Sequence, residues 1–205
     1  MSVLRYSLVI GSMVALATSA GCSSETTTYV DNSTDILAND VMPEPETGNM
    51  MMGNAMVPGG ERAEAVLKTA DDTEVGTAVI QQMGDGLQAT VQVSGVPAGK
   101  HGAHVHMTGT CEAPDFKSAG GHWNPEGTQH GLENPQGAHA GDMPNLVVGA
   151  DGSGSLTFML PGGTFESLME DDGAAFVVHA GEDDLSTDPA GDAGARFACG
   201  VFEAE

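Results

Sequence analysis

The stretch "HGAHVHMTGTC" (residues 101–111) decides how the chain is interpreted, because it holds three of the seven histidines and one of the three cysteines. If Val105 lies in a β-strand, side chains two positions apart project from the same face at a spacing of about 7 Å. His104 and His106 then point the same way, and one ion can contact both rings. The stretch therefore predicts a β-strand that carries a metal site.

Short apolar runs precede and follow this strand, separated by the Gly, Asp, Asn and Pro residues that are typical of turns. No long apolar stripe with the 3.6-residue period of a helix is present. The predicted strands are residues 63–70, 76–83, 87–96, 101–107, 145–149, 155–160, 174–179 and 195–202, and the two long loops are residues 108–144 and 180–194. We expect an all-β, eight-stranded Greek-key barrel or sandwich, immunoglobulin-like, with two long loops.

Length and charge limit the function classes. A chain of 205 residues with 40% apolar content suits one domain with an appendage. The net charge is −23 and only six residues are Lys or Arg, so nucleic acid is excluded as an expected partner, because its phosphates need clustered positive charge. Acidity of this kind serves solubility, and it bears on function if the substrate is an anion.

Residues 1–22, "MSVLRYSLVIGSMVALATSAGC", predict an export signal: a short start with Arg5, an apolar run to about Ala17, and then small residues. The run is too short to span a membrane. Its ending "SAGC" resembles a bacterial lipobox, in which Cys22 carries lipid and becomes the mature N-terminus. Ordinary cleavage after Ala20 stays open, because Ser19 stands where Leu is usual.

The cysteine count favours the lipid interpretation. Lipidation of Cys22 leaves an even number of other cysteines, whereas a secreted protein without it would hold an odd reactive thiol. We therefore expect residues 1–21 to be a lipoprotein-type signal peptide. The protein is then exported to the periplasm or cell envelope as a membrane-anchored lipoprotein.

Residues 22–60 are rich in polar residues, Pro and Gly, and predict a disordered tether before a domain at residues 61–205. Four methionines lie close together in this tether: Met50, Met51, Met52 and Met56. Thioether sulfur is a soft ligand that favours Cu(I), so a copper-collecting role is one interpretation. A methionine cluster without function is the other.

The other histidines and one acidic residue form a second pattern. Three histidines lie in the first long loop, at positions 122, 130 and 139, with Asp142 shortly after, and His179 ends a predicted strand. Three imidazoles and one carboxylate make a sound tetrahedral zinc set. A bound metal also explains how so long a loop stays folded. Any one histidine alone is more often a surface or hydrogen-bonded residue, but the combination indicates a metal centre.

Longer strings of the sequence carry a family resemblance. Residues 61–205 resemble the bacterial copper/zinc superoxide dismutases through the strings "HGAHVHMTGTC", "KSAGGHWNP", "HGLENPQGAHAGDMPNL", "HAGEDDLSTDPAG" and "GARFACGVF", in the family's order. The resemblance implies an eight-stranded Greek-key barrel. It also implies dismutation of superoxide to dioxygen and hydrogen peroxide by alternating reduction and oxidation of a histidine-bound copper, with structural zinc.

The resemblance further assigns residues, position by position. It implies copper at His104, His106, His122 and His179, and zinc at His122, His130, His139 and Asp142, so that His122 bridges the two metals. Asp183 matches the aspartate that orients one ligand of each metal, and Arg196 matches the arginine beside the open copper face. Cys111 and Cys199 match the family's disulfide, and His101 matches no ligand.

The chain departs from the family at several positions without losing a ligand. Ala103 stands where a large aromatic residue is usual, Met107 where Glu is common, and Trp123 where Phe or Tyr follows the bridging histidine. The loop after His179 has no lysine to attract superoxide, which lowers the expected association rate and leaves the reaction type unchanged.

Two other functions stay open on the sequence alone. One is a non-catalytic copper-binding or copper-delivery lipoprotein on the same fold, and the other is a structural β-domain that binds only zinc. The expected partners are superoxide as substrate and a membrane through the lipid at Cys22; a homodimer stays open, because no interface can be identified from the sequence.

Overall fold

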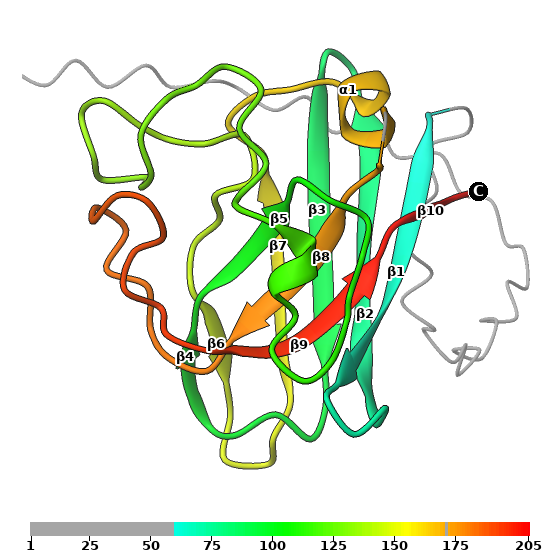
Figure 1. Cartoon of the computed structure of the whole chain (residues 1–205), viewed down its shortest axis with the longest axis vertical. Helices are drawn as coiled ribbons and strands as arrows, with labels where there is room; N and C mark the ends of the chain where they lie inside the picture. The colour runs from blue at the N-terminus through cyan, green and yellow to red at the C-terminus, as the bar shows by residue number, and fades with distance from the viewer. Residues whose placement is uncertain (1–59, 171) are drawn as a thin grey trace, which may run out of the picture. The chain divides into compact units, whose positions relative to one another are not determined.

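The computed structural model describes residues 60–205 except residue 171. The predicted signal peptide, the lipidation site Cys22, the tether and its methionine cluster lie outside the described residues. Ten strands of the described part form one sheet that nearly closes into a barrel (Figure 1). The strands are β1 Arg62–Thr69, β2 Glu74–Met83, β3 Gly86–Val93, β4 Gly99–His101, β5 Ala103–His106, β6 Leu146–Val148, β7 Gly154–Met159, β8 Ala175–His179, β9 Arg196–Val201 and β10 Glu203–Ala204.

The barrel closes through the segment that contains the first three histidines. The strand order is β4-β6-β7-β3-β2-β1-β9-β8-β5, so β4 and β5 lie at opposite ends of the path. Only Gly102 separates them in the chain, and β4 pairs antiparallel with β6 while β5 pairs antiparallel with β8. Residues 99–106 therefore act as one strand that joins both ends of the sheet. Counted this way, and without the two-residue β10, the barrel has the eight strands that the sequence predicts.

The connections follow the predicted Greek-key pattern. Strands β1, β2 and β3 form an antiparallel meander, but β3 pairs next with β7 rather than with β4. The chain leaves β3, crosses to β4, and the pair β6 and β7 fills the gap between them.

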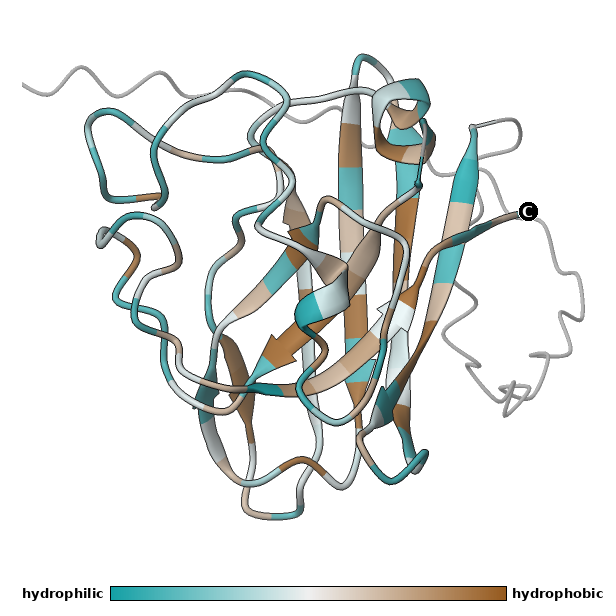
Figure 2. Ribbon diagram, in the orientation of Figure 1, coloured by the Kyte–Doolittle hydropathy of each residue, from teal (hydrophilic) through white to brown (hydrophobic). Residues whose placement is uncertain are grey.

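Alternating side chains explain why these segments pair as strands. In β1, Ala63, Ala65 and Leu67 are fully buried, and the residues between them face outward. Figure 2 shows the same alternation of hydrophobic and hydrophilic residues along the long strands. Ile80 and Phe176 fill the same core. Burial of each large side chain of this kind stabilises the fold by about 1.5–3 kcal/mol.

Helical structure is limited to a 3-10 turn, Lys117–Ala119, and one helix, α1 Phe165–Met169, within the described residues. Helix α1 is not among the predicted elements. A capping box holds its first turn: Ser167 N donates to the Thr164 side chain, and Thr164 N donates to the Ser167 hydroxyl. In the described part of the chain, no helix has the length and apolar character needed to cross a membrane.

The two long loops lie side by side at one edge of the barrel, as the green and orange-red segments at the left of Figure 1. Hydrogen bonds join them directly, because Glu133 N donates to Leu185 O at 2.9 Å. The disulfide between Cys111 and Cys199 ties the start of the first loop to β9, with the two Cα atoms 5.7 Å apart. The expected disulfide is therefore present.

Candidate metal centre

Strands β5 and β8 bring three histidines together. His104 and His106 lie on β5, and His179 ends the neighbouring strand β8. Strands β5 and β8 pair antiparallel in a continuous register. All three are buried. The ring centroids of His104 and His179 are 4.9 Å apart, and those of His106 and His179 are 5.7 Å apart. The two histidines of β5 therefore point toward one site, as the sequence predicts.

Backbone hydrogen bonds place the first long loop against the same strand. Trp123 N donates to Val105 O, Gly141 N donates to Trp123 O, and Val105 N donates to Gly141 O, all at 2.8–2.9 Å. Each of these residues adjoins a candidate ligand in the sequence. The closed set of three bonds therefore fixes His122 and Asp142 relative to His104 and His106.

Three groups of possible metal ligands have donor atoms within 4.8 Å of one another; one of them is His104, His130 and Asp183, and the other two are sets of four residues. The first set is His104, His106, His122 and His179, and the second is His122, His130, His139 and Asp142. His122 belongs to both. Both sets match those implied by the resemblance.

Five buried ring nitrogens of these residues have no hydrogen-bond partner among the described residues, an arrangement that is costly unless something else binds them. They are His104 Nδ1, His106 Nε2, His122 Nε2, His139 Nδ1 and His179 Nε2. Four of the five belong to the first set, and imidazole suits copper as well as zinc. The donor atoms therefore fit the metals that the resemblance implies.

Hydrogen bonds at the other ring nitrogens fix which nitrogen stays free. His106 Nδ1 lies 3.0 Å from Gly120 O, and His179 Nδ1 lies 3.3 Å from Gly194 O. A carbonyl only accepts, so each Nδ1 carries the proton and donates it. The Nε2 atoms of both rings are left with a lone pair for a metal.

Asp142 organises the second set. Its Oδ1 lies 2.8 Å from His122 Nδ1 and 3.0 Å from His130 Nδ1. Its Oδ2 accepts from the backbone N–H groups of Gly131 at 2.8 Å and His139 at 2.9 Å. One carboxylate thus orients three histidines and the loop that carries them.

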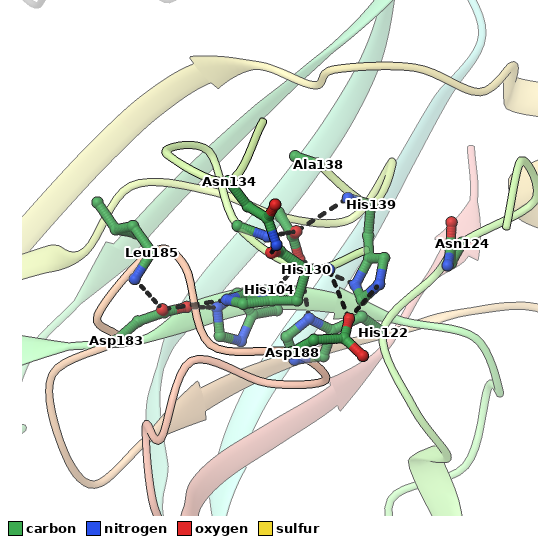
Figure 3. A network of polar contacts seen from close by, with 12 residues as sticks. His104, His122, Asn124, His130, Asn134, Ala138, His139, Asp183, Leu185 and Asp188 are labelled. Atoms are coloured by element: carbon green, nitrogen blue, oxygen red, sulfur yellow. Dashed lines mark hydrogen bonds and ion pairs between the residues drawn. The ribbon is translucent and has the colours of Figure 1, made fainter. Parts of the chain in front are cut away.

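Asp183 links the two sets from outside, as Figure 3 shows. Its carboxylate lies 2.5 Å from His104 Nε2 and 3.1 Å from His130 Nε2, so it contacts one ring of each set. Gly191 leaves room for this contact, because a Cβ on it would collide with Asp183 Oδ1 and would lie 2.7 Å from His130 Nε2.

Two residues that support the site are not among those assigned from the sequence. Asn145 holds the backbone of Asp183 through a reciprocal pair of hydrogen bonds, each 2.8 Å long. Asp188 accepts from His130 N at 2.7 Å. No sequence spacing points to Asn145, whereas Asp188 is one of several acidic residues in the second loop and gives only a weak signal.

The environment keeps three histidines of the first set neutral: His104, His106 and His179. Burial lowers the pKa of His104 to about 4 and that of His179 to about 3, and it holds the pKa of His106 well below its ordinary value. A neutral imidazole is the form that binds a metal.

His130 behaves differently. Burial opposes its charge, but hydrogen bonds with Asp142 and Asp183 outweigh this effect and raise its pKa to about 9. Burial also opposes the charges on the two carboxylates, yet their histidine contacts hold both pKa values far below the ordinary range. Without zinc, the second set therefore holds a proton on His130.

A cavity of about 570 Å³ opens onto the centre and is lined by His106, His122, His179 and Arg196, among others. The Arg196 guanidinium donates from Nη1 to Phe116 O at 2.6 Å and from Nη2 to Gly120 O at 2.5 Å. These bonds to neutral carbonyls fix the side chain and do not pair its charge with a carboxylate. The site therefore presents a positive charge beside the neutral His106 and His179.

Arg196 is the one Lys or Arg of the described chain without a carboxylate within ion-pair distance. Lys117 pairs with Asp115 at 2.7 Å, and its side chain is 81% exposed. The other cations are paired as well: Arg62 with Glu64 and Glu205, Lys68 with Asp72, and Lys100 with Glu182. Lys117 does not line the cavity, so Arg196 is the only Lys or Arg among its described lining residues.

His101 is buried beside the centre and takes no part in either set. Its Nδ1 lies 2.8 Å from His179 O, and its Nε2 lies 2.8 Å from Pro97 O. Both ring nitrogens of His101 therefore face backbone carbonyls outside the two sets.

Comparisons with known proteins support the geometry. The family model for copper/zinc superoxide dismutase (SODC) matches residues 74–202. A copper/zinc superoxide dismutase of Aquifex aeolicus is 38% identical over 161 residues, which cover 76% of this chain and 94% of the relative. One from Caulobacter vibrioides is 39% identical over 148 residues, or 69% of this chain and 85% of the relative.

Two solved structures of SOD-like and Cu/Zn superoxide dismutase proteins are also similar to this chain. A SOD-like protein from Bacillus subtilis matches with a TM-score of 0.64 at 36% identity, over 67% of this chain and 96% of that one. A Cu/Zn superoxide dismutase from Brucella abortus matches with a TM-score of 0.59 at 35% identity, over 70% of this chain and 100% of that one.

Proposed function

The chain belongs to the copper/zinc superoxide dismutase family, and from that premise we propose which metal each of its two overlapping donor sets binds. The protein is a superoxide dismutase that converts superoxide into dioxygen and hydrogen peroxide with copper and zinc as cofactors. The observation that supports the proposed division is the set of buried ring nitrogens without partners among the described residues.

In this proposal, His104 binds copper through Nδ1, and His106, His122 and His179 bind it through Nε2. Zinc would be held by His122, His130, His139 and Asp142, so His122 would serve both ions. When bound, copper supplies one-electron chemistry between its +2 and +1 states, and zinc has a structural role.

His122 is proposed to carry the proton that the product needs. Its Nδ1 stays oriented toward Asp142 and the zinc set, so a proton would be carried on Nε2, and only while that nitrogen is not holding copper. Nε2 faces the same group of atoms as His106 and His179. A proton on this atom is therefore within reach of a substrate in the cavity.

Arg196 is proposed to bind and orient the anion. Superoxide carries one negative charge, and Arg196 places a fixed positive charge and forked N–H donors in the cavity wall. Asp183 acts behind both sets as a positioning residue, since it holds His104 and His130 at once.

The division is tested by the metal content of two variants. His122→Ala should lose superoxide dismutation and retain zinc poorly, because one ring serves both ions. His104→Ala should lose copper and activity but keep most of its zinc. Equal loss of both metals in the two variants would contradict the bridging role of His122.

We also infer export and anchoring. The sequence "SAGC" and the cysteine count support a lipid on Cys22, which would place the domain in the periplasm or cell envelope at the end of a tether. Cys22→Ser should then move the protein from the membrane fraction to the soluble fraction. A wild-type protein that is already soluble, with Gly21 as its first residue, would overturn the lipoprotein assignment. A homodimer is consistent with the family and is tested by sedimentation of the same preparations.

A further inference from the structure

Met107 lies directly beside the candidate copper ligands but is not one of them. It follows His106 in the chain, its N–H donates to Gly121 O at 3.0 Å, and it is 57% exposed. A Cβ on Gly120 would lie 3.0 Å from Met107 Cγ and 3.7 Å from its sulfur, so the thioether rests on the segment that leads into His122. The exposed position leaves its thioether sulfur accessible from solvent.

The side chain lies in the wall of the cavity that reaches the copper ligands. His106, His122 and His179 line this cavity, and Met107 lines it with them. The other cavities found in the described part contain none of these three histidines. A copper ion that enters this cavity on its way to the buried nitrogens therefore comes into the neighbourhood of Met107.

Among the described residues that line the cavity, Met107 supplies the only sulfur atom. The polar groups of Asn124 and Thr128 are used by each other and by Ala138 O. Asp188 offers a hard carboxylate, and Arg196 carries a positive charge that repels a cation. A soft thioether prefers Cu(I) over Cu(II) or Zn(II). Met107 is thus the one donor at the opening that distinguishes Cu(I) from the other ions.

We propose that Met107 is a transit ligand for Cu(I): its sulfur binds the ion at the opening of the cavity and passes it to His106 and the other copper ligands. The ligand class is a soft monovalent cation, and no bond of the protein is broken. Met107 takes no part in the final copper site. This inference rests on the proposed function, in which the four histidines of the first set bind copper.

The experiment measures copper uptake rather than activity. The zinc-loaded, copper-free full chain is mixed anaerobically with Cu(I) in acetonitrile and quenched at intervals with excess bathocuproine disulfonate, and the copper that resists chelation is counted. A parallel series uses Cu(II) sulfate quenched with EDTA. Met107→Leu removes the sulfur at similar side-chain volume.

Met159→Leu is the matched control. Met159 is 45% exposed, lies on β7 away from the cavity, and its sulfur accepts a contact from Gln88. All variants keep the four methionines at positions 50, 51, 52 and 56, so any uptake through them is common to every sample.

Met107→Leu should take up Cu(I) about fivefold more slowly than wild type, which corresponds to about 1 kcal/mol of barrier. Its Cu(II) uptake, its final copper content and its zinc content should equal those of wild type, and Met159→Leu should match wild type in both series. An unchanged Cu(I) rate in Met107→Leu would overturn the proposal. Equal slowing of Cu(I) and Cu(II), or equal slowing in Met159→Leu, would overturn it too, since cavity shape or general packing would then be responsible.

The underlying copper assignment fails in a different way. If His104→Ala retains as much chelator-resistant copper as wild type, copper does not reach the proposed histidines. If wild type loads fully, His104→Ala does not, and Met107→Leu loads at the wild-type rate, only the transit role is wrong.

Discussion

Arg196 and His106 donate to the same carbonyl oxygen, that of Gly120, at 2.5 Å from Nη2 and 3.0 Å from Nδ1. The shared acceptor fixes the guanidinium and a copper ligand relative to each other. It also keeps the His106 proton on Nδ1, so that Nε2 is free. The group proposed to attract superoxide and a group proposed to hold the metal are therefore positioned by one backbone atom.

The first prediction concerns this guanidinium. Superoxide carries one negative charge and the chain carries −23, so a positive charge in the cavity must offset the repulsion that superoxide meets as it enters. Arg196→Glu should lower the second-order rate roughly ten- to hundredfold, or about 1.4–3 kcal/mol of barrier, because it replaces an attractive charge with a repulsive one. Stopped-flow or pulse-radiolysis assays of the metal-replete protein measure this, with copper and zinc contents unchanged.

Lys117→Glu is the matched control for Arg196→Glu. It makes the same charge change on a side chain that is already paired with Asp115 and does not line the cavity. Its rate should stay within about twofold of wild type, because this side chain is exposed and its charge is screened by solvent and salt. Equal rates in Arg196→Glu and wild type at low salt would rule out Arg196 as the anion guide.

Ionic strength gives an independent check on the same charge. The screening length falls from about 10 Å at 0.1 M to about 3 Å at 1 M salt. Salt should slow wild type weakly and accelerate Arg196→Glu, because the dominant local charge differs in sign. Acceleration of both proteins would mean that the surrounding carboxylates, and not Arg196, control entry.

A second prediction links zinc binding to pH through His130. Its pKa is raised to about 9 in the metal-free fold, so its proton stabilises that fold most fully below the ordinary histidine pKa and less as pH rises through about 9. Zinc must displace this proton. The gain in Tm on zinc loading should therefore grow as pH rises from about 6.5 toward 9.

Calorimetry measures the same proton. Zinc added to the metal-free protein at neutral pH should release about one proton from His130, seen as a dependence of the heat on the ionisation enthalpy of the buffer. His130→Gln should bind zinc more weakly and lose this part of the release. A zinc affinity that is independent of pH across the window would contradict the raised pKa.

A third prediction concerns the contact of Asp183 with both donor sets. Gly191 has a φ of +62°, and a Cβ there would collide with Asp183 and His130. Gly191→Ala should weaken retention of both metals about tenfold or more, equivalent to about 1.4 kcal/mol. Metal loss to a chelator, followed in time, measures this.

Gly127→Ala separates collision from backbone strain. Gly127 has a similar φ of +69°, but a Cβ added to it would have no neighbouring atom within 4 Å. Both variants carry the strain of a left-handed alanine, about 1–2 kcal/mol, and only Gly191→Ala carries the collision. Equal metal loss in the two variants would show that strain, and not the Asp183 contact, is responsible.

The strands were predictable because their signal is local. Ala63, Ala65 and Leu67 alternate with outward-facing residues, so the pattern within one strand already indicates its buried face. Helix α1 has only five residues, too few to show a helical period. Its capping box uses Ser167 in place of the usual Glu or Gln, which hides the signal for its start.

The site was predictable where residue types carry the chemistry, and unpredictable where contacts join distant segments. The histidines and Asp142 stand out by type and spacing. Asn145 supports Asp183 across 38 positions of sequence, and nothing in either local sequence indicates the pair. The pairing of Lys117 with Asp115, which leaves Arg196 alone in the cavity, likewise depends on side-chain directions that the sequence does not specify.

The most direct test of the central claim is a joint measurement of bound metals and superoxide consumption on one purified, metal-replete sample. We expect one copper and one zinc per chain, and catalytic removal of superoxide that is lost together with copper when the copper is removed and returns with it. Full loading with both metals but no catalysis would instead identify a copper-binding protein on the same fold. Zinc without stable copper would identify a structural β-domain, and either result would contradict the account.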